Sequence, residues 1–75
     1  MITLEKVCEL AREYCKNSII VILENKYGYL ISVKDADISP TYINKRTGKI
    51  SNYFPPDHSI EELKSFKKVK ILKGV

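Results

Sequence analysis

The most apolar part of the chain is residues 18–34, where two runs of β-branched, aliphatic and aromatic side chains flank a short polar segment. The runs are residues 19–23 and 27–33; Asn25 lies between them, and Gly28 is the second residue of the second run. β-Branched and aromatic side chains favour strands, and Asn and Gly supply the positive φ angles of a tight reversal. The pattern therefore predicts a β-hairpin around which the rest of the chain is organised.

A helical period comes before the hairpin. Thr3 is suited to cap the start of a helix, with Ile2 and Val7 placed to pack together across the first turn. At about 100° per residue, the apolar side chains of this segment fall within one arc: Leu4, Val7, Cys8, Ala11, Tyr14 and Cys15. Asn17 tolerates the left-handed conformation in which many helices end. We expect a helix over residues 3–16 that lies along one face of a sheet.

The first strand of the hairpin is apolar on both faces. Ile20 and Ile22 point to one face, and the residues between them point to the other. We expect Leu30 of the second strand to lie on the same face as Ile20 and Ile22. One helix cannot cover both faces of a sheet, so the face with these three residues needs another cover.

Two covers remain open for the face that bears Ile20, Ile22 and Leu30. The face is either a protein interface, in a homodimer or with a partner protein, or it lies under the C-terminal residues 69–72. A large exposed apolar patch is unusual on a stable monomer, and full burial of such side chains stabilises a protein by roughly 1.5–3 kcal/mol each. We favour the hypothesis that the face with Ile20, Ile22 and Leu30 is a protein interface.

A second hairpin is predicted from residues 41–44 and 49–54, with Gly48 available for a left-handed position in the turn. Pro55 and Pro56 end its second strand, because proline has no backbone donor for a ladder. Three of its side chains are expected to point to the core: Ile43, Ile50 and Phe54.

A short helix is predicted after the two prolines. Ser59 and Glu62 have the spacing of a capping box, in which each side chain bonds the other residue's backbone amide. Its inward side chains are expected to be Ile60, Leu63 and Phe66. In residues 67–73, lysines alternate with apolar residues, which favours an edge strand, and a continued helix is the alternative.

These elements predict one small α+β domain over residues 1–75. An N-terminal helix packs on a mostly antiparallel sheet of four or five strands, and a short helix comes near the C-terminus. A domain of 75 residues buries only about 60% of the surface of its unfolded chain, so its stability is expected to be marginal. Association with a partner would add to that stability.

The net charge of +4 lies entirely in the second half of the chain. Residues 1–35 carry five basic and five acidic side chains, whereas residues 36–75 carry eight and four. One interpretation is a small nucleic-acid-binding protein that holds phosphates with Lys64, Lys67, Lys68 and Lys70. Arginine is scarce, however, and lysines on an edge strand commonly serve solubility, so nucleic acid is the less favoured partner.

No group of residues has the spacing of a catalytic, cofactor or metal site. Asp57, His58 and Ser59 are sequence neighbours whose side chains cannot usually converge in a relay, and Ser59 already has a capping role. Cys8 and Cys15 lie seven residues apart on one helix, roughly 10 Å, which is too far for a disulfide. We expect reduced, buried cysteines and a chain that is not an enzyme.

A metal site and a membrane span are also poorly supported. Two cysteines and one distant histidine are too few ligands for structural zinc. Asp35 and Asp37 could begin a cation site, but we interpret them as part of a solvated turn. Residues 1–5 do not resemble a signal peptide, and the longest apolar run, residues 19–23, is far short of the ~20 residues that span a bilayer. A cytoplasmic location is therefore expected.

The second hairpin carries a family resemblance. Its sequence Tyr42-Ile43-Asn44-Lys45-Arg46-Thr47-Gly48-Lys49-Ile50 resembles a signature of small bacterial YrhB-like proteins, which are related to immunity proteins of polymorphic toxin systems. In those proteins a helix, a hairpin, this signature and a proline before a short acidic helix follow in the same order. The resemblance implies a non-enzymatic protein that binds and neutralises a partner toxin.

Overall fold

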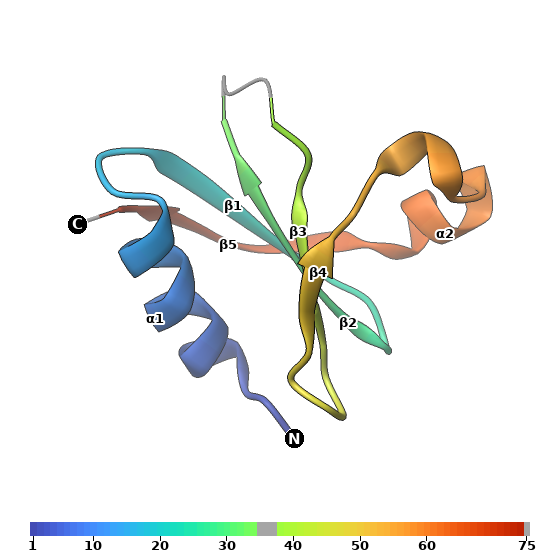
Figure 1. Cartoon of the computed structure of the whole chain (residues 1–75), viewed down its shortest axis with the longest axis horizontal. Helices are drawn as coiled ribbons and strands as arrows, with labels where there is room; N and C mark the ends of the chain where they lie inside the picture. Colours follow the sequence, from blue (N-terminus) through green and yellow to red (C-terminus); the bar gives the residue numbers. More distant parts are fainter. Residues whose placement is uncertain (35–37, 75) are drawn as a thin grey trace.

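A computed structural model describes residues 1–34 and 38–74 of the chain (Figure 1). The elements are α1 (Leu4–Tyr14), β1 (Ile19–Glu24), β2 (Gly28–Val33), β3 (Thr41–Asn44), β4 (Ile50–Asn52), the 3₁₀ turn η1 (Pro55–Asp57), α2 (Ile60–Ser65) and β5 (Lys67–Lys73). The five strands form one antiparallel sheet in the order β4-β3-β2-β1-β5. The predicted α+β fold is confirmed, and residues 67–73 are a strand at the edge of the sheet. The turn predicted at Asp35 and Asp37 lies outside the described residues.

Both ends of α1 show local features that the sequence predicts. The Thr3 hydroxyl accepts a hydrogen bond from the backbone amide of Lys6 at 3.3 Å. At the other end, Cys15 is the C-cap, and Asn17, two residues later, has a φ of 61° in the turn that leads to β1. Tyr14 was expected on the buried arc, but its side chain is exposed.

The larger core lies between α1 and one face of the sheet, which we call the α1 face. Figure 1 shows α1 alone on its side of the strands. The buried residues of this core come from the helix and four strands: Val7, Cys8, Ala11, Ile20, Ile22, Tyr29, Ile31, Ile43 and Leu72. The helix packs on one face of the sheet as predicted, but this is the face of β1 that carries Ile20 and Ile22, which was expected to need a different cover.

A smaller core lies on the opposite sheet face, which we call the α2 face. It joins Leu30, Tyr53 and Phe66, with partly buried residues around them: Leu23, Tyr42 and Leu63. The chain from η1 to the end of α2 covers this end of the sheet (Figure 1). Gly28 makes room for the core, because a Cβ atom there would lie 2.5 Å from the Tyr42 ring.

The expected grouping of Ile20, Ile22 and Leu30 on one face is wrong. In the β1–β2 ladder Leu23 is opposite Leu30 and Ile22 is opposite Ile31, so Leu30 belongs to the α2 face. All three side chains are buried by other parts of the same chain. Strand β5 extends the sheet beside β1 and does not fold over either face.

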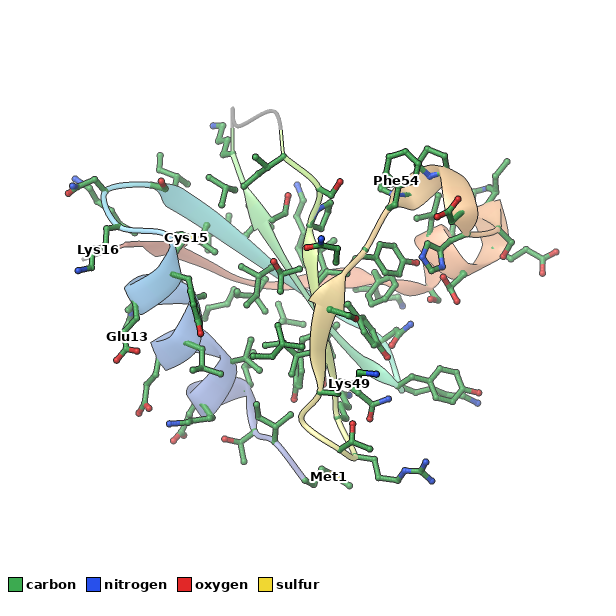
Figure 2. The ribbon with its side chains drawn as sticks, in the orientation of Figure 1. Met1, Glu13, Cys15, Lys16, Lys49 and Phe54 are labelled. Carbon is green, nitrogen blue, oxygen red and sulfur yellow. The ribbon has the colours of Figure 1, made fainter. Side chains whose placement is uncertain are left out.

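Three further side chains expected in the core are exposed: Ile50, Phe54 and Ile60. Strand β4 ends at Asn52, and Phe54 lies on the segment that leaves it toward η1 (Figure 2). The neighbouring Tyr53 is buried in its place, because α2 covers the face to which Tyr53 points. Of the other expected core residues of these segments, Ile43 and Phe66 are buried and Leu63 is half-buried.

Candidate functional site

The outer side of β5 is an open sheet edge within the described residues. This strand pairs only with β1, and six of its seven residues are exposed. The backbone amide of Gly74 donates a hydrogen bond to the Ser18 carbonyl oxygen at 2.8 Å. This bond shows which residues of β5 direct their backbone groups toward β1. Because hydrogen-bonded pairs alternate with unbonded ones in an antiparallel ladder, the backbone groups of Ile71 and Lys73 point away from β1.

On the α2 face, the surface next to this edge is apolar and uncovered. Ile71 is 67% exposed and its neighbour across the ladder, Val21, is half-buried. Ile19, at the start of β1, is 47% exposed. The cover that η1 and α2 provide lies over the other end of the sheet, around Leu30 and Tyr53. We call Ile19, Val21, Ile71 and the outer side of β5 the edge surface.

On the α1 face, a groove of about 420 Å³ runs between α1 and β5. Leu4 and Cys8 give it an apolar floor. Its charged residues come in equal numbers of each sign: Glu5, Glu9, Arg12 and Lys70. The groove therefore offers apolar contact without a net charge of its own.

The lysines proposed for nucleic-acid binding do not share one face. Lys70 is opposite Ile22 in the ladder and lines the groove beside α1. Lys68 is opposite Leu23 and so lies on the α2 face, and a register shift between Ile22 and Leu23 separates the two lysines. Lys64 lies on α2. The structure thus distributes these charges around the β5 edge and does not gather them into one basic patch.

A second site candidate lies under α2, where Tyr53, His58 and Glu62 are in contact. The His58 and Tyr53 rings stack with centroids 3.8 Å apart and planes 8° apart. Both the Tyr53 hydroxyl and His58 Nδ1 lie 2.5 Å from Glu62 Oε2. The sequence predicted that Glu62 would bond back to the Ser59 amide, but its carboxylate instead joins these two rings.

Burial and the Glu62 carboxylate both raise the pKa of Tyr53 well above its usual value of 10.0. Desolvation is the larger cause, because the phenolate is disfavoured away from water. The hydroxyl therefore remains a hydrogen-bond donor at neutral pH. A hollow of about 220 Å³ beside it is lined by the rings of three tyrosines and one phenylalanine and by five polar residues: Tyr27, Tyr42, Tyr53, Phe66, Asn25, Ser51, Asn52, His58 and Glu62.

The residues Asp57, His58 and Ser59 do not form a catalytic relay. The Ser59 hydroxyl accepts a hydrogen bond from the Glu62 amide at 3.1 Å, which is its predicted capping role. His58 is directed to Glu62 and Tyr53. Among residues 1–34 and 38–74, no three His, Cys, Asp or Glu side chains are grouped to hold a metal ion.

The two cysteines are free thiols. Cys8 is buried against the sheet as predicted, and Cys15 is half-buried at the C-terminal end of α1 (Figure 2). Burial raises the pKa of the Cys15 thiol, which lowers its reactivity at neutral pH.

Sequence reasoning found the β5 edge but missed what surrounds it. The groove beside α1 depends on how a helix sits across a sheet, and the Tyr53–His58–Glu62 contact depends on the path of η1.

In the described part of the chain, no helix is long and apolar enough to cross a membrane. Comparison with family models, with curated proteins and with solved structures finds no match to this chain.

Proposed function

We propose that this chain is a non-enzymatic module that binds another protein through the edge surface. The observation that carries the proposal is the open edge of β5 beside the exposed side chains of Ile19 and Ile71. An edge strand presents unpaired backbone donors and acceptors, and exposed apolar side chains next to it add contact area for a partner. Such edges are a recurring site of protein recognition.

The size of the domain agrees with this proposal. Its free energy of unfolding is expected to be about 4–11 kcal/mol, at roughly 0.05–0.15 kcal/mol per residue. A partner that binds only the folded state at 100 times its Kd would add about 2.7 kcal/mol. Binding to a partner would therefore change the stability of the chain substantially.

The kind of partner follows from the resemblance of the β3–β4 signature to YrhB-like proteins. Those proteins are related to immunity proteins, so the proposed partner is a toxin that this chain binds and neutralises in the cytoplasm. Two observations support this part of the proposal: the signature around Thr47-Gly48 and the order of elements along the chain.

A nucleic-acid-binding function for Lys64, Lys67, Lys68 and Lys70 is the rival proposal. It receives less support because Lys68 and Lys70 lie on opposite faces of the sheet. Phosphate binding gains from several cations along one surface that follows the nucleic-acid backbone.

The test uses two isoleucines of equal exposure. Ile71 on β5 is 67% exposed and Ile60 on α2 is 69% exposed, so Ile71→Glu and Ile60→Glu change the surface equally but in different places. The immobilised chain is exposed to an extract of its own cells, and each retained protein is identified, purified and titrated in calorimetry. We expect one protein to bind the wild type and Ile60→Glu at 1:1, and to bind Ile71→Glu at least about tenfold more weakly.

Two results would overturn the proposal. One is a partner that binds Ile71→Glu and Ile60→Glu equally, which would place the interface elsewhere. The other is retention of nucleic acid with submicromolar affinity at ~150 mM salt and a steep salt dependence, which would favour the rival function.

A further inference from the structure

We propose that the partner presents an extended segment that pairs with β5 as a sixth strand and carries acidic side chains alternating with apolar ones. This inference rests on the proposed function and specifies the chemistry of the partner. Three separate features of the edge carry it: the direction of the backbone groups, the groove on the α1 face, and the unpaired lysines on the α2 face.

The backbone of β5 is set for strand pairing at two positions. The amide and carbonyl groups of Ile71 and Lys73 point outward, since the alternate residues Leu72 and Gly74 face β1. An extended segment beside β5 would bond these groups in the same pattern as β1 does on the other side. Strand addition of this kind supplies affinity through the main chain and specificity through alternate side chains.

On the α1 face, the side chains of an added strand would meet the groove between α1 and β5. Leu4 and Cys8 form its apolar part, and its volume of about 420 Å³ accommodates side chains of the size of valine or leucine. The charges around it, Glu5 and Glu9 against Arg12 and Lys70, balance. The groove therefore offers apolar contact to a side chain of the segment that lies beside Lys70 on the α1 face.

On the α2 face, the side chains of the same strand would meet two lysines with the exposed side chain of Ile71 between them. Lys68 and Lys73 lie on this face of β5, and the β1 residues opposite them are apolar, Leu23 and Ile19. None of the ion pairs among the described residues includes either lysine. Acidic side chains directly opposite cationic ones stabilise an antiparallel pair, so carboxylates are favoured at the positions opposite Lys68 and Lys73.

A second copy of the chain is a poorer occupant of the edge. All four charged residues of β5 are lysines, at positions 67, 68, 70 and 73. Two β5 strands paired edge to edge would place these cations beside one another, and like charges directly opposite are destabilising. An acidic partner segment reverses the sign of that interaction.

The test titrates the isotope-labelled full chain with synthetic nine-residue peptides and follows backbone amide shifts by NMR. The first peptide alternates glutamate with valine, the second has the same composition with its glutamates and valines in two blocks, and the third alternates lysine with valine. We expect the first peptide to bind at least about tenfold more tightly than either of the others at ~150 mM salt. The largest shifts should be at Ile71 and Lys73.

A backbone variant separates strand pairing from simple charge attraction. Ile71→Pro removes an outward N–H that β1 does not use, and proline is tolerated on such an edge position. Ile71→Thr keeps the N–H and serves as its control. We expect Ile71→Pro to weaken the first peptide about tenfold or more, and Ile71→Thr to change its binding less than about threefold.

A charge variant tests the role of the β5 lysines in peptide binding, even if Ile71→Pro does not fold. In Lys68→Glu/Lys73→Glu, the alternating lysine–valine peptide should bind more tightly than the glutamate–valine peptide. The inference is overturned where the block peptide binds as well as the alternating one, where the shifts map to α2, or where the charge variant does not reverse the preference. A partner whose binding still depends on Ile71 in the capture experiment would then preserve the proposed function and exclude only strand addition.

Discussion

A Cβ atom on Gly74 would lie 1.8 Å from the carbonyl oxygen of Cys15, so the end of β5 packs directly on the turn between α1 and β1. The Gly74 amide also donates to the Ser18 carbonyl at 2.8 Å in the same turn. The atoms that a larger residue would meet belong to the backbone, which cannot rotate away as a side chain can. This contact joins the three elements that border the edge surface.

We therefore expect Gly74→Ala to lower the free energy of unfolding by about 2–3 kcal/mol, the upper part of the usual cost of forcing extra atoms into a packed site. Gly48→Ala is the matched control, because a Cβ atom on Gly48 would meet no other atom within 4 Å and only its φ of 73° opposes the substitution. Its expected cost is about 1 kcal/mol, from the left-handed backbone alone. Equal losses in urea unfolding of the two variants would contradict the close contact at Cys15.

The buried hydroxyl of Tyr53 predicts a loss of stability at alkaline pH. Its pKa is raised in the folded chain above the value of 10.0 that it has when unfolded, and burial and Glu62 also raise the pKa of Tyr42. A raised pKa favours folding fully below the unfolded value, and this contribution falls as the pH rises above it. Stability should therefore decline progressively from about pH 10 upward.

Tyr53→Phe tests the source of that decline. The variant should lose about 1 kcal/mol at pH 8 because the hydrogen bond to Glu62 is gone, and its stability should fall less steeply between pH 10 and 12. Tyr14→Phe, at an exposed ring, controls for the general effect of removing a hydroxyl. A wild-type curve that is parallel to the Tyr53→Phe curve over this pH range would refute the assignment.

Local chemistry explains why much of the fold could be predicted from the sequence. Thr3 and Ser59 cap the two helices, and Asn17 and Gly48 adopt the left-handed conformations expected of them. Each of these depends on a few neighbouring residues. The alternation of lysine with apolar residues likewise predicted β5 as an edge strand.

The faces of the strands could not be predicted in the same way, because they depend on register. Leu30 pairs with Leu23 across the hairpin, and a loop one residue longer or shorter would have moved Leu30 to the face of Ile22. Hydrophobic content alone does not distinguish the two registers here, since β1 is apolar on both faces. The same limit applies to Tyr53 and Phe54, whose burial depends on where α2 lies.

The two thiols should react at different rates. Cys8 is buried under α1, whereas Cys15 is half-buried and has a pKa raised by desolvation. At pH 7 we expect a disulfide reagent to modify Cys15 first and more slowly than a free thiol, and Cys8 only when α1 opens. In Cys15→Ser only Cys8 remains, so the slower modification rate of Cys8 can be measured alone. Equal rates at both positions, or a Cys8–Cys15 bridge in the oxidised protein, would be inconsistent with the position of α1.

The strongest test of the corrected core is a pair of substitutions on β1. Ile22 is 0% exposed against α1, and Ile19, three residues earlier, is 47% exposed on the other face. Ile22→Glu removes roughly 1.5–3 kcal/mol of apolar burial and also places a carboxylate away from water, which costs further free energy. Against an expected total of about 4–11 kcal/mol, that loss should leave much of the protein unfolded at 25 °C.

Ile19→Glu should fold, because its side chain can remain in water. Circular dichroism and analytical ultracentrifugation distinguish the two expectations. The core described above requires that Ile22→Glu lose its cooperative unfolding transition while Ile19→Glu keeps it. If instead Ile22→Glu stayed folded and only changed its oligomeric state, Ile22 would lie at an interface between chains and α1 would not cover it.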